Sequence, residues 1–170
     1  PPPTSPAVST GASYTTSLGA SNITYYAKFS VQSYQITVNP NGATGGTNLS
    51  GWYSAPGTAA SAINGVTSSR TITMVYGSTL KMTAPEKTGY TFKGWSRTSG
   101  STGTLNSTTG DSTYVCGAGA ATLTAQWTAK EYTITYIPNG GSVTPASDTF
   151  TIESAINLPT PKREGYVFDG

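Results

Sequence analysis

The sequence predicts a mainly β protein made of small α+β modules in tandem, with at most a short helical turn in each module. β-Branched and aromatic residues occupy alternate positions in several short segments, which is the period of a half-buried strand. Glycine and proline separate these segments, and no stretch keeps a long helical period. Two segments also recur along the chain at fixed spacings, as in repeat proteins.

The recurring segments define the organisation of the chain. Residues 34–42 (YQITVNPNG) recur as residues 132–140 (YTITYIPNG), at an offset of 98 residues. Residues 85–94 (PEKTGYTFKG) recur as residues 161–170 (PKREGYVFDG), at an offset of 76 residues. The offsets differ by 22 (98 − 76), so the middle copy contains 22 extra residues between its two recurring segments.

Residues 1–33 are expected to be a linker followed by the closing half of a preceding repeat. The opening Pro1-Pro-Pro-Thr-Ser-Pro6 is typical of stiff, extended chain. The sequence of residues 23–31 is typical of a strand. Within it, the tripeptide that ends at Phe29 stands 98 residues before the Ala-Gln-Trp tripeptide that ends at Trp127.

Residues 34–127 are expected to form one complete module. Apolar and polar residues alternate in its first strand, and the Asn-Pro-Asn-Gly tetrapeptide after it suits a tight turn. Residues 79–84 suit one short helical turn, which Pro85 would end. The extra residues are expected to form an inserted loop at about 43–66. Further strands are expected at residues 71–76, 90–95 and 121–127.

Residues 128–131 are expected to be a linker, and residues 132–170 the opening half of a following repeat. Two interpretations of the half repeats remain open. The chain is either an excerpt from a long tandem array, or each open half is completed by the next subunit in a head-to-tail fibre. Heterologous contacts of the second kind generate open filaments.

The recurring segments, together with the closing Ala-x-Trp of residues 125–127, resemble the Listeria–Bacteroides repeat, also called the internalin B-type repeat. The resemblance covers residues 34–42, 76–127 and 132–170, and the end of an earlier copy at about 21–31. The positions that carry this repeat signature are Tyr34, Ile36, Asn41, Gly42, Pro85, Gly89, Tyr90, Phe92, Gly94, Trp95, Trp127, Tyr132, Ile134, Asn139, Gly140, Pro161, Gly165, Tyr166, Phe168 and Gly170.

The resemblance implies compact β-grasp-like modules in tandem on large bacterial cell-surface or secreted proteins. Such repeats act as stalks, spacers or adhesins, and the family brings no catalytic residues. Three departures stand out: the extra residues of the middle copy, Phe29 where a closing tryptophan is usual, and Asn39-Pro40 where an acidic residue is more common. The inserted residues are where an activity outside the family pattern would lie.

The amino-acid composition restricts the kinds of partner that the chain can bind. The chain has 9 Lys and Arg against 7 Asp and Glu, and about three residues in ten are Ser or Thr. This is too little basic charge to follow nucleic-acid phosphates, and no apolar run approaches the length that spans a bilayer. We therefore expect an extracellular or bacterial cell-surface location, no membrane insertion in this segment, and neighbouring repeats or subunits along a stalk or fibre as partners.

No catalytic or cofactor site is expected. The chain has no histidine, which removes Ser-His-Asp and Cys-His arrangements and the commonest metal ligand. Its few carboxylates are scattered along the sequence, so neither a paired-carboxylate site nor a metal site is built. The predicted function is a non-catalytic structural segment of a cell-surface protein, with no metal and no cofactor.

Trp52 and Tyr53, inside the expected inserted loop, carry the alternative function. An exposed pair of aromatic rings would present a platform to a carbohydrate or a host surface. The same pair would instead support the fold if its rings packed back against the module. The sequence allows both, and it makes Trp52 and Tyr53 the candidate ligand-binding residues.

Two covalent devices found in surface proteins have candidate residues here. A thioester between Cys116 and Gln126 lacks a recognisable motif, so Cys116 is expected to be a small core residue. An isopeptide bond needs a lysine in an apolar pocket beside an acid, and Lys81 and Lys93 are the candidates. No acid is identifiable by spacing from either lysine.

Overall fold

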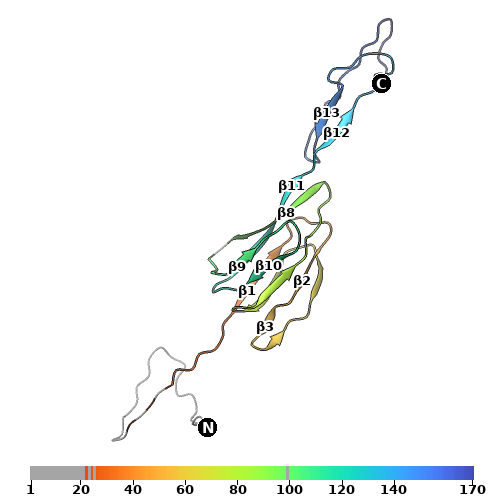
Figure 1. Cartoon of the computed structure of the whole chain (residues 1–170). Helices are drawn as coiled ribbons and strands as arrows, with labels where there is room; N and C mark the ends of the chain where they lie inside the picture. The colour runs from red at the N-terminus through yellow and green to blue at the C-terminus, as the bar shows by residue number, and fades with distance from the viewer. Residues whose placement is uncertain (1–21, 23, 25, 99) are drawn as a thin grey trace. The chain divides into compact units, whose positions relative to one another are not determined.

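The computed structural model describes residues 22, 24, 26–98 and 100–170, and the chain divides into two units, residues 1–30 and 31–170. The expected linker at the start of the chain lies outside the described residues. All the strands that the structure describes belong to the second unit, and the described residues contain no helix (Figure 1). The prediction of a mainly β fold is confirmed. No described segment forms a helix that could span a membrane.

Thirteen strands are formed by the described residues, and they make two larger sheets and two hairpins. In chain order the strands are β1 (Ser33–Asn39), β2 (Thr47–Ser50), β3 (Tyr53–Ala55), β4 (Thr58–Ala59), β5 (Ile63–Val66), β6 (Arg70–Val75), β7 (Thr79–Met82), β8 (Tyr90–Thr98), β9 (Thr104–Asn106), β10 (Ser112–Val115), β11 (Ala121–Ala129), β12 (Tyr132–Thr135) and β13 (Ser147–Phe150).

The first sheet has the order β6-β1-β11-β8. Its central pair joins segments far apart in the sequence, because β1 lies parallel to β11 with Ile36 opposite Ala121. The outer strands are antiparallel to their neighbours. Alternation places Ile36 and Val38 on one face of β1, where both are fully buried, so the sequence pattern of residues 34–38 marks the core side of the sheet.

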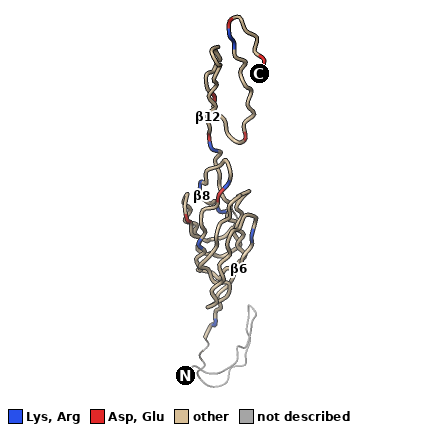
Figure 2. Tube along the Cα trace, turned by 90° about the vertical axis from the view of Figure 1, so that its right-hand side faces the viewer, with Lys and Arg blue, Asp and Glu red and all other residues tan. Residues whose placement is uncertain are grey.

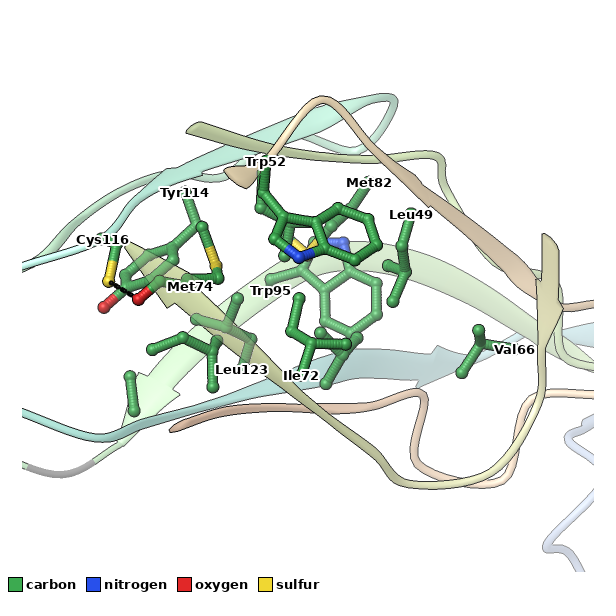
Figure 3. Close-up of a cluster of buried hydrophobic side chains, with 14 of the residues drawn as sticks. Leu49, Trp52, Val66, Ile72, Met74, Met82, Trp95, Tyr114, Cys116 and Leu123 are labelled. Carbon is green, nitrogen blue, oxygen red and sulfur yellow. Dashed lines mark hydrogen bonds between the residues drawn. The ribbon is translucent and has the colours of Figure 1, made fainter. Parts of the chain in front are cut away.

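The second sheet has the order β5-β2-β7-β10-β9 and covers the buried face of the first. Its inward side chains, among them Leu49, Met82 and Tyr114, join those of the first sheet in one apolar cluster (Figure 3). This core belongs wholly to residues 34–127. Its buried members are Ile36, Val38, Leu49, Trp52, Val66, Ile72, Met74, Leu80, Met82, Phe92, Trp95, Tyr114, Cys116, Ala121, Leu123 and Ala125.

Two segments of this module differ from the expectation. Residues 79–82 form strand β7 rather than a helical turn, because Leu80 and Met82 alternate with Lys81 and point into the core. The extra residues at 43–66 contain four short strands instead of an irregular loop. They contribute Leu49 and Trp52 to the core, so the insertion is part of the packed module.

Residues 132–170 contain the hairpin of β12 and β13, with Tyr132 opposite Phe150 at its end, and an isolated antiparallel bridge between Ser142 and Lys162. The rings of these two residues lie 5.5 Å apart between centroids. Residues 166–168 form no strand, although their equivalents 90–92 begin β8 in the first module.

Candidate interaction surfaces

Charged groups do not gather into a site in the part of the chain that the structure describes. Figure 2 shows lysine, arginine and carboxylate residues dispersed along the trace. No group of three or more His, Cys, Asp and Glu among the described residues is placed to hold a metal ion. The candidate surfaces are therefore built from aromatic rings, single cations and backbone groups.

The two candidate ligand-binding residues point in opposite directions. Trp52 is only 3% exposed and lies within the core, with Leu49, Met82 and Tyr114 in the same cluster (Figure 3). Tyr53 begins β3 and is 45% exposed. Successive side chains of an extended chain face opposite sides, so the burial of Trp52 turns Tyr53 outward. The two rings do not form one platform, and Tyr53 alone is on the surface.

Cys116 is a buried residue of the core. Its Sγ lies 3.6 Å from the carbonyl oxygen of Met74, toward which the thiol donates a weak hydrogen bond (Figure 3). Burial raises the pKa of the Cys116 thiol, which keeps it protonated and unreactive. This environment is that of a small hydrophobic residue. Lys81 and Lys93 are both exposed, so neither lies in the apolar pocket that an isopeptide bond requires.

A cation stacks on aromatic rings where β8 begins. The Lys87 ammonium lies 4.2 Å from the centroid of the Tyr90 ring and 5.9 Å from that of Trp127. It also lies 3.5 Å from the carbonyl oxygen of Asn41, to which it donates. A surface hollow of about 560 Å³ is bordered by Lys87, Tyr90, Trp127 and Phe92, among others. The lysine thus ties the first turn of the module to its closing strand.

The same arrangement is built at the equivalent place in residues 132–170. The Arg163 guanidinium lies 4.0 Å from the centroid of the Tyr166 ring and donates to the carbonyl oxygen of Asn139 over 3.2 Å. A hollow of about 290 Å³ is bordered by these residues and Phe168. Asn139 has φ 45° and its counterpart Asn41 has φ 53°, the left-handed conformation that asparagine adopts in turns. Both copies therefore form the same turn and the same cation contact.

Comparison with protein families agrees with this repeated geometry. Residues 55–131 match the divergent InlB B-repeat domain, and residues 132–170 match the Listeria-Bacteroides repeat domain. Residues 55–170 therefore contain these two repeat domains in tandem. Below, residues 34–127 are called the first B-type repeat and residues 132–170 the second. Repeats of these families are typical of cell-surface proteins and are typically non-catalytic.

One curated relative extends over most of the chain. It is the "Putative Gly-rich membrane protein" of Evansella cellulosilytica, 29% identical over 159 residues. The match covers 92% of this chain but only 15% of that protein. No solved structure matches the chain significantly, so the β-grasp likeness remains a prediction.

The positions of the repeat signature divide by role. Buried positions fill or border the core of the first B-type repeat, and exposed ones form its turns or lie in the second. The buried group is Ile36, Pro85, Phe92, Gly94 and Trp95; the half-buried group is Tyr34, Gly89, Tyr90, Trp127, Ile134 and Pro161; the exposed group is Asn41, Gly42, Tyr132, Asn139, Gly140, Gly165, Tyr166, Phe168 and Gly170.

Sequence reasoning missed two groups of interacting residues. The first is the pair of cationic side chains, Lys87 and Arg163, that stack on tyrosine rings. The sequence contained a signal for this contact, because the two residues occupy the same position in the two copies, 76 residues apart. The second is Glu153, which accepts a hydrogen bond from the Tyr90 hydroxyl over 2.7 Å. Residue 153 lies outside the recurring segments, so no pattern marked it.

The junction between the two B-type repeats is short and held by several contacts. β11 ends at Ala129 and β12 begins at Tyr132, which leaves two residues between the strands. The Lys130 amide donates to the carbonyl oxygen of Gly89 over 2.8 Å. Gly89 also faces Ile152 of the second repeat, whose Cδ1 is 2.8 Å from the place of a Cβ at Gly89. These contacts limit how far the connection can bend.

Ionisation of Tyr90 is expected to weaken this junction at high pH. Its hydrogen bond to Glu153 raises the pKa of the Tyr90 phenol above the ordinary value of 10.0. A phenol with a raised folded-state pKa contributes stability that is fully present below about pH 10 and is lost as the pH rises through the raised value. The ring ¹³C shift of Tyr90 should titrate above pH 10, and Glu153→Gln should lower that midpoint toward the ordinary value. Glu131→Gln is the control and should leave the midpoint in place; an unchanged midpoint in Glu153→Gln would contradict the assignment.

Proposed function

We propose that this chain is a non-catalytic structural segment of a bacterial cell-surface or extracellular protein, within a stalk, adhesin or fibre. Its tandem repeats set a fixed distance between whatever lies before and after them. The observation that carries the proposal is the two-residue connection between β11 and β12, held by the Lys130 to Gly89 hydrogen bond. A linker this short, and hydrogen-bonded, has little freedom to reorient.

Neighbouring repeats or subunits along such a stalk are the partners that this function requires. Low charge and abundant serine and threonine support an extracellular setting. The surface families to which the repeats belong support the same setting. The relative from Evansella cellulosilytica, described as a membrane protein, is consistent with a protein displayed at a membrane.

A spin-label distance measurement tests the spacing role. Labels on Lys81→Cys in β7 and Thr149→Cys in β13 occupy exposed strand positions, one in each repeat, and the native Cys116 is buried. We expect one narrow distance population. Inserting a Gly-Ser-Gly-Ser segment between Lys130 and Glu131 should broaden that population strongly.

A label pair inside the first repeat, on Lys81→Cys and Lys93→Cys, provides the control for folding. Its distance should be the same with and without the insertion. If the distribution of distances between the labels at residues 81 and 149 were as broad in the parent chain as in the insertion variant, the chain would not fix a spacing. The proposed role would then be wrong.

A further inference from the structure

We infer that the surface hollow at the start of β8 binds a carboxylate-bearing sugar unit of an acidic polysaccharide. The hollow is bordered entirely by residues between 44 and 130. The side chains that contact the sugar in this inference are Lys87, Lys130, Tyr90, Trp127, Thr44 and Thr88. The inference adds a ligand to the spacing role, and neither role depends on the other.

The charge of Lys87 is the first reason. Its side chain is half-buried, and its ammonium lies 4.2 Å from the centroid of the Tyr90 ring. Among the described residues no carboxylate lies within ion-pair distance of that ammonium, which donates to the carbonyl oxygen of Asn41 over a long 3.5 Å. A partly desolvated ammonium gains strongly from an anion that reaches it. Lys87 therefore has hydrogen-bonding capacity left for a carboxylate.

The Lys87 side chain is also held in place before a ligand arrives. Its Nζ lies 3.5 Å from the place of a Cβ at Gly42, so the ammonium rests against the first turn on one side. The Tyr90 ring supports it on another side. A lysine that is already ordered loses less side-chain entropy on binding than a free one, which strengthens the binding of its ligand.

Aromatic rings and hydroxyl groups supply the rest of the hollow. Tyr90 and Trp127 are half-buried, so part of each ring is left to pack against the C–H groups of a sugar. Thr44 and Thr88 are exposed, with their hydroxyl oxygens 3.3 Å apart. The Thr88 amide donates to Thr44 Oγ1 over 3.2 Å, which fixes this pair in position to bond sugar hydroxyls. Aromatic rings with a few placed polar groups are typical of small-ligand sites.

The charges at the border favour an acidic sugar over a neutral one. Lys87 and Lys130 border the hollow, against the single carboxylate of Glu86. Lys130 is exposed, so it adds attraction that salt screens rather than a fixed contact. The volume of about 560 Å³ falls within the range of roughly 300–1,000 Å³ that small-molecule sites occupy. One sugar unit can therefore place its carboxylate at Lys87 and its ring in the same hollow.

Binding to immobilised polygalacturonate tests the inference. The same polymer, with its carboxylates reduced to alcohols, is the ligand control. The unmodified chain should bind the acidic polymer and not the reduced one. Lys87→Gln removes a charged hydrogen-bond donor and should weaken binding at least about tenfold. Lys87→Arg keeps both the charge and the contact with the ring, so it should retain most of the affinity.

Lys81→Gln is the matched control variant. Lys81 is exposed on β7 and does not border the hollow, so its loss removes the same charge from another surface. Its affinity for polygalacturonate should stay nearly unchanged. The midpoint of thermal unfolding reports whether each variant is folded, because neither Lys81 nor Lys87 belongs to the core.

The indole N–H signals of the chain locate the site. The chain has three tryptophans, of which Trp52 and Trp95 lie in the core and Trp127 borders the hollow. Adding oligogalacturonate to the ¹⁵N-labelled chain should shift the Trp127 indole signal and leave the other two in place. Shifts at Trp52 or Trp95 without one at Trp127 would place the ligand elsewhere and overturn the inference.

Absence of binding to polygalacturonate would also overturn the inference, and so would equal binding to the reduced polymer. The same holds for an affinity that Lys87→Gln leaves unchanged. An equal loss of affinity in Lys81→Gln and Lys87→Gln would show attraction to positive charge in general and would count against the hollow as the site. None of these results alters the spin-label distance, so the spacing role and the ligand site can fail separately.

Discussion

Trp52→Ala is expected to lower the free energy of unfolding by about 3–5 kcal/mol, the range for deleting a large buried aromatic side chain. Trp52 is only 3% exposed and packs against residues of both sheets, so its removal leaves a cavity in the single core of the first repeat. For a module of this size, thermal denaturation should show a fall of more than about 10 °C in the midpoint. Trp52→Phe should recover part of the loss.

Tyr53→Ala is the matched control, because Tyr53 is the next residue but is 45% exposed. It should change the stability by less than about 1 kcal/mol. Glycan-array binding of the same variants separates the two readings of this aromatic pair. Binding that is lost in Tyr53→Ala at an unchanged midpoint would favour recognition of carbohydrate. A Trp52→Ala variant that kept its midpoint would contradict the structural role of the indole.

Gly117→Ala is expected to destabilise the first repeat by at least about 3 kcal/mol and to reduce the yield of folded protein. A Cβ at residue 117 would lie 2.0 Å from the Gly103 amide nitrogen and 2.3 Å from the Thr102 carbonyl carbon. Both are backbone atoms, so no side chain can rotate away to make room. The two segments would have to separate, which would disturb the buried hydrogen bond between Ser101 and Tyr114.

Gly110→Ala is the control for the Gly117 variant. A Cβ at residue 110 meets only the Thr108 hydroxyl oxygen at 3.8 Å, an ordinary contact. Denaturant unfolding followed by circular dichroism should therefore give this variant a free energy of unfolding within about 0.5 kcal/mol of that of the unmodified chain. Equal midpoints for the two variants would show that the close approach at Gly117 does not constrain the fold.

The parts of the fold that could be predicted from the sequence are those governed by local pattern. Alternation identified the core side of residues 34–38, and asparagine before glycine marked the turns at Asn41 and Asn139. The repeated closing tripeptide, 98 residues apart in its two copies, marked the end of the first repeat, where β11 lies. These features depend on residues close together in the chain, or on a copy of themselves.

The parts that could not be predicted depend on pairing between distant segments. Residues 79–84 are short and precede a proline, so a helical turn and a strand were both compatible with the local sequence. Pairing with β2 and β10 makes residues 79–82 the strand β7 rather than a helical turn. The burial of Trp52 could not be predicted either, because the pocket that receives it is built by Met82 and Tyr114 from the second half of the module. The contact of Tyr90 with Glu153 joins two repeats, and no pattern within one repeat marks it.

The parallel pairing of β1 with β11 determines how the first repeat would carry a load. β1 is the first strand of the repeat and β11 is its last, and their chains run in the same direction side by side. Tension pulling the two ends apart would slide these strands along each other, so the ladder between them would resist as a whole. In a hairpin pulled at its two ends, by contrast, the bonds open one after another. A stalk segment with this pairing would therefore unfold only at a higher pulling force than a segment whose ends lie in a hairpin.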